Sequence, residues 1–137
     1  MRLVKSSALA LMLVASAATA QASAEIGLSK EKDINAGLLV IAVADKIRRE
    51  CSDISARLFD ARSYLVSLKQ KAAEKGYSDA EIDAYINNDA EKAKMRERRN
   101  AYFQAHGASN REPASLCALG RAEIQKQSQI GLLLRTK

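Results

Sequence analysis

The chain has 137 residues and a formal net charge of +6, and its length allows one domain with one core. Aromatic residues make up 4% of the sequence and tryptophan is absent, so the composition disfavours recognition of sugars or bases by stacking. The basic balance is compatible with nucleic acid, an anionic membrane surface or an acidic protein as partner, and other features must decide among them.

The first 20 residues predict a secretory signal peptide. Arg2 and Lys5 form a short basic start, 8–18 is an apolar run rich in Ala and Leu, and 18–20 has the small residues of a cleavage site. Residues 22–24 offer a second site, so cleavage after residue 24 is the alternative. The apolar run is too short to span a bilayer. The competing interpretation is a buried N-terminal helix of a cytosolic protein.

Cleavage leaves residues 21–137 as a helical domain that works outside the cytoplasm. Two of the 22 basic residues lie in the signal peptide, so the remainder carries a net charge of +4. Export separates the protein from nucleic acid, and we therefore predict no nucleic-acid partner. We also predict no transmembrane segment in the mature chain, because its longest apolar run is too short.

The first predicted helix runs from Asp33 to Glu50. Its segment 38–44 is apolar all round, and periodicity alone would also allow a buried strand. Charged residues continue the helical pattern beyond this segment. A helix that is apolar on all sides is buried on all sides, so we place it at the centre of a bundle.

A second helix is predicted from Ser52 or Asp53 to Lys75. Gly76 follows it as the natural residue for a left-handed helix end. Apolar residues along this helix are spaced alternately three and four apart, which predicts one core-facing seam. The seam consists of Ile54, Leu58, Ala61, Leu65, Leu68 and Ala72.

The middle of the chain is rich in helix start and stop signals. Ser78 and Glu81 form a capping box that opens a short helix. The segment 87–89 reads as a break, with Asn88 or Asp89 as the cap of a helix from Ala90 to Ala105. We expect Gly107 to end that helix.

Pro113 is expected to be the first residue of the last long helix. Gly120 in this helix would let a neighbouring element approach closely. Ser128 is expected to restart a final turn, after which the leucine-rich C-terminal segment docks on the core. The complete pattern predicts an all-α, single-domain bundle of four or five helices.

Cys51 and Cys117 are the two cysteines, and in an exported small domain an even count implies a disulfide. The bond would join the junction of the first two helices to the last helix. Closing a loop of this length contributes about 4 kcal/mol in chain-entropy terms. A redox or metal pair is the alternative, but the spacing is not C-x-x-C, and two cysteines with one histidine cannot complete a four-ligand site.

Candidate catalytic residues are few. His106 is the single histidine, and its place before a glycine at a helix end favours an interaction with the helix dipole over catalysis. Glu123, between apolar neighbours, is the best candidate for a carboxyl with a raised pKa, although a structural pairing with Arg121 or Gln127 is favoured. We predict no catalytic residue, no metal site and no cofactor.

Two further groups of residues have mainly structural interpretations. Segment 91–99 has a net charge of +3 and reads either as a basic docking surface or, preferably, as a solvated helix with support from pairs such as Glu91 and Lys94. The tyrosines are expected at the edge of the core. They are Tyr64, Tyr77, Tyr85 and Tyr102.

Five segments together resemble one known family. They are C-S-D-I-S-A-R-L-F at 51–59, G-Y-S-D-A-E-I at 76–82, D-A-E-K-A-K-M at 89–95, L-C-A-L-G-R-A-E-I at 116–124 and S-Q-I-G-L-L-L at 128–134. The chain is similar to a family of exported alphaproteobacterial proteins classed only as a domain of unknown function. The resemblance implies a bacterial, periplasmic setting and supports the cysteine pair. It brings no activity, ligand or catalytic residue.

The leading functional hypothesis is a non-enzymatic periplasmic protein that binds a protein partner, as an accessory component of an envelope assembly. One alternative is a small periplasmic chaperone or stress protein that exposes apolar helix faces. Another is a small hydrolase of envelope polymers, for which Glu123 is the nominated residue. Binding of an apolar ligand between helices is a further option that requires a cavity.

Overall fold

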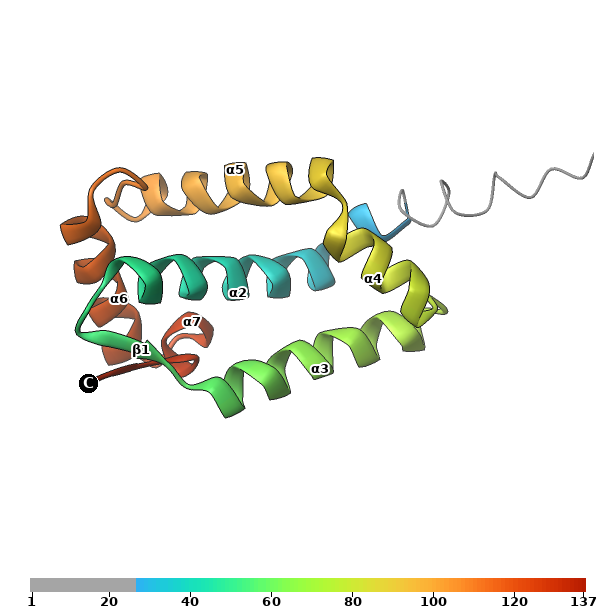
Figure 1. The fold of residues 1–137 in the computed structure, drawn as a ribbon, viewed down its shortest axis with the longest axis horizontal. Coiled ribbons are helices and arrows are strands. Elements are labelled where there is room, and N and C mark those ends of the chain that lie inside the picture. The colour runs from blue at the N-terminus through green and yellow to red at the C-terminus, as the bar shows by residue number, and fades with distance from the viewer. Residues whose placement is uncertain (1–26) are drawn as a thin grey trace, which may run out of the picture.

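The computed structural model describes residues 27–137. The predicted signal peptide and both of its cleavage sites lie outside the described residues. Helix α2, Lys32–Glu50, lies at the centre of the fold, as the sequence predicts. It contacts α3, α5, α6, α7 and β1, and Figure 1 shows α5 and α3 on opposite sides of it. The apolar sequence of α2 is explained by this position, because neighbouring elements cover most of its circumference.

The segment after α2 corrects the prediction for the second helix. Residues Ile54–Ala56 form strand β1, which pairs antiparallel with β2, Leu134–Thr136. Helix α3 therefore begins only at Leu58. The backbone amide of Arg57 donates to the Leu133 carbonyl, so the pairing continues up to the start of the helix.

The late start of α3 changes which residues of the predicted seam are buried. Ile54 is buried, but as a strand residue, while Leu68 and Ala72 are buried on the helix as expected. Leu58 is 76% exposed, so its predicted place in the core is wrong. Leu58 lies in the first turn of α3, after strand β1 has ended, and its side chain is outside the core.

The predicted helix start and stop signals of the central segment are confirmed. Helix α3, Leu58–Glu74, is followed by Gly76 with a φ of 95°. Helix α4, Asp79–Asn87, begins at the predicted capping box: the Ser78 side chain accepts from the Glu81 amide, and the Glu81 carboxylate accepts from the Ser78 amide. Helix α5, Asp89–Ala105, is capped by the Asn88 side chain.

The C-terminal part also follows its signals. Helix α6, Pro113–Lys126, begins at the proline, and Ser128 caps the single-turn helix α7, Gln129–Leu132. A Cβ atom at Gly120 would lie 2.6 Å from Ile47 and 2.8 Å from Ile54. The predicted close approach is thus confirmed, since only glycine lets α6 lie this near to α2 and β1.

Buried apolar residues form two clusters along α2. The main core surrounds its C-terminal half, and the minor core lies between its N-terminal end, α3 and α4. The main core consists of Val43, Ala44, Ile47, Cys51, Ile54, Phe103, Ala108, Leu116, Leu119, Ile130, Leu133 and Leu134. The minor core consists of Leu28, Ile34, Ala72, Ile82 and Tyr85.

The predicted disulfide between Cys51 and Cys117 is present, with the two Cα atoms 5.5 Å apart. It fastens the end of α2 to α6 beside the main core. The fold is therefore an all-α bundle with one disulfide, to which the structure adds the short β1–β2 pair. Across residues 27–137, no helix is long and apolar enough to cross a membrane.

Candidate functional site

One face of α2 is left open by its neighbours. The sequence predicts that the apolar segment 38–44 is buried on all sides, yet Leu38, Ile41 and Ala42 are each only partly buried. They lie on the side of α2 between α3 and α5. In this segment only Val43 and Ala44 are fully covered by neighbouring elements, while 38–42 are partly buried, so the prediction of complete burial is wrong.

A groove follows this open face, and we call it the α2 groove. Its larger part is a hollow of about 200 Å³ at the corner where α2 meets α4 and α5. A second hollow of about 180 Å³ shares Ile41 and Asp45 with the first and extends to the start of α3 and to β2. The first hollow is lined by Leu38, Ile41, Ala42, Asp45, Tyr85, Ile86, Glu91, Lys92 and Met95.

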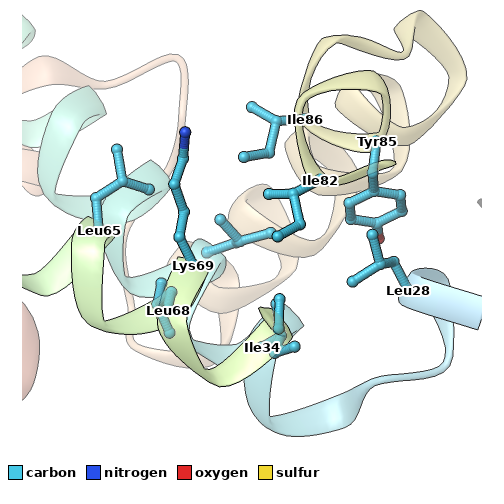
Figure 2. A pocket seen from close by; sticks show the side chains of 10 residues that line it. Leu28, Ile34, Leu65, Leu68, Lys69, Ile82, Tyr85 and Ile86 are labelled. Carbon is cyan, nitrogen blue, oxygen red and sulfur yellow. The ribbon is translucent and has the colours of Figure 1, made fainter. Parts of the chain in front are cut away.

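A third hollow in the minor core is nearly filled by side chains, with a volume of about 10 Å³. Figure 2 shows Ile82, Ile86 and Tyr85 of α4 facing Leu65, Leu68 and Lys69 of α3. The Lys69 amine points away from the apolar side chains and lies 3.2 Å from the Asp83 carboxylate. This crevice leaves no room for a ligand, so the α2 groove is the better candidate site.

Arginine side chains gather around Asp45, where the two hollows of the groove meet. The Asp45 carboxylate accepts from Arg48, 2.6 Å away, and from Arg49. Burial and the nearby charges of Arg49 and Arg96 hold the pKa of Arg99 below its ordinary value, while Asp45 opposes this. Two guanidinium groups thus pair with the Asp45 carboxylate, and Arg99 lies near enough to interact with Arg49 and Asp45. Cations therefore outnumber carboxylates at this part of the groove.

The α5 wall of the groove adds to that charge. Segment 91–99 is helical and more than half of its residues are exposed, with the Lys94 amine 2.7 Å from the Glu91 carboxylate. Lys92 and Met95 of the same segment line the groove. No ion pair within residues 27–137 involves Lys92. The excess of basic residues was the available sequence signal for this surface, but it did not show which residues face the groove.

Glu123 is buried, being 3% exposed, but it lies outside the α2 groove. Its carboxylate accepts from the Tyr102 hydroxyl at 2.9 Å and from the Ser128 hydroxyl. The expected partners were wrong, because Arg121 binds the Asp53 carboxylate at 2.9 Å and Gln127 takes the left-handed conformation that ends α6. Glu123 therefore joins α5, α6 and the start of α7 by hydrogen bonds, an arrangement that favours a structural role.

The Tyr102–Glu123 pair has a clear electrostatic consequence. Burial, followed by the hydrogen bond to the Glu123 carboxylate, raises the pKa of Tyr102 to about 12. The neutral hydroxyl is the form that can donate to the carboxylate. Tyr102 therefore remains protonated over the whole physiological range and keeps Glu123 supplied with a donor.

His106 lies at the C-terminal end of α5, as the sequence predicts, and is exposed. Its Nδ1 lies 2.8 Å from the Tyr102 carbonyl, and its ring stacks on that of Tyr102 with centroids 4.0 Å apart. The contact with a carbonyl of the last turn is the interaction expected of a histidine at this end of a helix dipole.

Three of the four tyrosines lie at core edges, as predicted, but the prediction is wrong for Tyr85, which is buried. Tyr64 and Tyr102 pack partly buried against the main core, Tyr77 packs against the minor core and Tyr85 is a member of it. The Tyr85 hydroxyl donates to the Asn35 side chain at 2.6 Å within the protein interior. Among the described residues, no group of three or more His, Cys, Asp or Glu side chains could hold a metal ion.

Comparison with protein families gives one match, which covers residues 27–135. The matching family is described as a family of unknown function, DUF5333, which agrees with the resemblance found in the sequence. No curated protein matches the chain, and no solved structure matches it either. The matched residues include the disulfide and the lining of the α2 groove. By this match over most of its length, the chain belongs to DUF5333, a family of unknown function.

Proposed function

We propose that this protein is an exported, non-enzymatic interaction protein, an accessory component of an envelope assembly, and that it binds its protein partner in the α2 groove. The observation that carries the proposal is the partly exposed apolar stripe of α2. Leu38, Ile41 and Ala42 form the floor of an open groove in the middle of the helix that organises the fold.

An apolar stripe of this kind has a physical cost in water. Covering exposed apolar surface with a partner makes the free energy of binding more favourable by about 25 cal/mol for each Å². Contiguous apolar patches therefore mark interaction sites. The charged groups around the groove make the contact selective, because they favour a partner with complementary charge. They also keep this surface soluble. These features support a role in binding, for which no catalytic group is needed.

Export is supported by two independent features of the chain. The first 20 residues have the order of a signal peptide, namely a basic start, an apolar run and a small-residue cleavage site. The Cys51–Cys117 disulfide suits an oxidising compartment such as the bacterial periplasm.

Site-specific crosslinking in the cell tests the proposal. A photo-crosslinking amino acid is placed at Ala42 in the groove or at Ala36, an exposed position on the same helix outside the groove. We expect one stoichiometric protein adduct from position 42 in the periplasmic or envelope fraction, and none from position 36. The absence of an adduct at position 42, or equal adducts from both positions, would contradict the proposal.

A second candidate function, a small periplasmic chaperone, is favoured by one observation. Leu58 and Phe59 at the start of α3 are 76% and 83% exposed, and such residues could hold unfolded clients. If this function holds, the oxidised protein suppresses aggregation of a model client, and changing both residues to serine abolishes the effect. Many substoichiometric adducts in the crosslinking experiment would also favour the chaperone.

A further inference from the structure

We infer that the α2 groove accepts an amphipathic helix of another polypeptide, one with an apolar face and acidic residues along its flanks. The inference rests on the proposed function and adds the chemistry of the partner. Three observations carry it: the shape of the groove, the charge at its edges, and the charges of the chain itself.

The shape of the groove matches a helix. Its floor spans α2 from Leu38 to Arg48, which at about 1.5 Å per residue is about 15 Å, or about three helical turns. It crosses from the corner of α4 and α5 to the start of α3, so an occupant would lie at an angle across α2, as packed helices do. A helix bound there would bury the apolar side chains of α2 that the fold itself leaves partly exposed.

The charge at the groove edges specifies the flanks of the occupant. Arg48 and Arg49 pair with the carboxylate of Asp45 where the two hollows meet, and Arg99 lies near enough to interact with it. Lys92 on the α5 wall is outside every ion pair of the described residues. An occupant with Glu or Asp on its flanks would place carboxylates beside these cations, whereas Lys or Arg there would be repelled.

The charges of the chain itself favour a different polypeptide as the occupant. Residues 1–24 contain Arg2 and Lys5 and no acidic residue, so this segment would bring more positive charge to a basic groove. A second copy of residues 21–137 would bring a net charge of +4. An anionic lipid surface would supply negative charge, but a recessed groove of three helical turns fits a helix better than a flat bilayer surface.

The test uses two synthetic peptides of about 18 residues, long enough to be partly helical alone. Both have the same apolar face of Leu and Ala, but one has Glu and the other Lys on its flanks. Fluorescence anisotropy measures their binding to the oxidised protein, processed as in the cell. We expect the Glu-flanked peptide to bind at least about tenfold more tightly, with the difference shrinking as salt screens the charges.

Two pairs of variants locate the binding. Ala42→Glu places a carboxylate on the groove floor and should weaken binding of the Glu-flanked peptide by about tenfold, whereas Ala36→Glu should not. Lys92→Glu should weaken that peptide by about threefold and strengthen the Lys-flanked one, because Lys92 lines the groove. Arg111→Glu, an exposed change of equal charge in the loop before α6, should alter neither. Unfolding curves establish that each variant is folded.

Equal binding of the two peptides, or equal effects of Ala42→Glu and Ala36→Glu, would overturn the inference. Vesicles containing anionic phospholipid provide the remaining comparison. If the protein binds these vesicles but neither peptide, the occupant of the groove is a lipid surface and the inference of a helix is wrong. If position 42 crosslinks one protein in the cell while the two peptides bind equally, the proposed function stands and only the partner chemistry fails. If position 42 crosslinks nothing, the proposed function fails as well.

Discussion

The two ends of α2 are held by different means. Its C-terminal half runs through the main core, where the disulfide, the β1–β2 pair and twelve buried residues come together. Its N-terminal end lies in the minor core, where five buried residues pack against α3 and α4. The first end is closed by a covalent bond and by backbone pairing, while the second depends on side-chain contacts.

The polar interactions at the second end are hydrogen bonds and ion pairs between side chains of different elements. The Asn35 side chain accepts from Tyr85 at 2.6 Å and donates to the Leu28 carbonyl at 2.8 Å. Arg98 of α5 donates to the same Asn35 oxygen at 3.3 Å. The comparison teaches that the fold has a rigid end and a more adjustable end, with the α2 groove between them. Regions with fewer buried contacts open first in native proteins, so α4 is the wall of the groove that can yield to a partner.

The largest expected effect is at the rigid end. Replacing both cysteines by serine should lower the free energy of unfolding by about 4 kcal/mol, because the disulfide closes a loop with a sequence separation of 66 residues. Denaturant titration measures this loss. Hydrogen exchange should show faster opening mainly in α6, α7 and the β1–β2 pair.

Wild-type protein under reducing conditions is the control and should match the double variant. Equal unfolding free energies of the oxidised protein and the double variant would show that the disulfide does not stabilise the rigid end, and the prediction would be wrong.

Alkaline pH should also weaken the rigid end. The pKa of Tyr102 is raised to about 12, so its neutral form is favoured in the folded protein, and this contribution is complete below about pH 10. Stability should then fall as pH rises from about 10 towards 12, because the unfolded chain releases the proton first. Unfolding free energies at a series of pH values measure the slope.

The matched variant is Tyr102→Phe, which should be less stable at neutral pH but show a shallower alkaline decline. Some decline should remain, since burial also raises the pKa of Tyr64 and Tyr85. An unchanged slope would mean that Tyr102 does not titrate differently in the folded and unfolded chains.

The smallest effect is expected at the adjustable end. Tyr85→Phe keeps the ring in the minor core but removes the hydroxyl that donates to Asn35, at a cost of about 1 kcal/mol. Hydrogen exchange should accelerate in α4 and change little in α6. If exchange rises equally at both ends, the two regions open as one unit and the comparison fails.

Local signals in the sequence were sufficient to predict most of the helices. Gly76, the Ser78 capping box, Pro113 and Ser128 each act within one or two turns, so their effect is visible without the fold. The cysteine pair was predictable because two cysteines allow one intrachain bond. The helix signals depend on residues close in sequence, and the disulfide follows from the number of cysteines.

Features that depend on distant segments were not predictable in this way. Strand β1 has three residues and finds its partner about 80 residues later, so no alternation pattern reveals it. The partial exposure of Leu38 and Ile41 depends on how α3, α4 and α5 are placed around α2. The α2 groove follows from that placement, and the sequence indicates only that its floor is apolar.

The composition of the main core has a consequence for biogenesis. Five of its twelve members, from Leu116 to Leu134, come from the C-terminal segment that begins with α6. A ribosome delivers these residues last, and a chain that is threaded through a membrane with its N-terminus leading delivers them last on the far side as well. The nascent chain therefore cannot complete its main core until synthesis is nearly finished. If the protein is exported as proposed, this delay keeps the chain unfolded and able to cross the membrane.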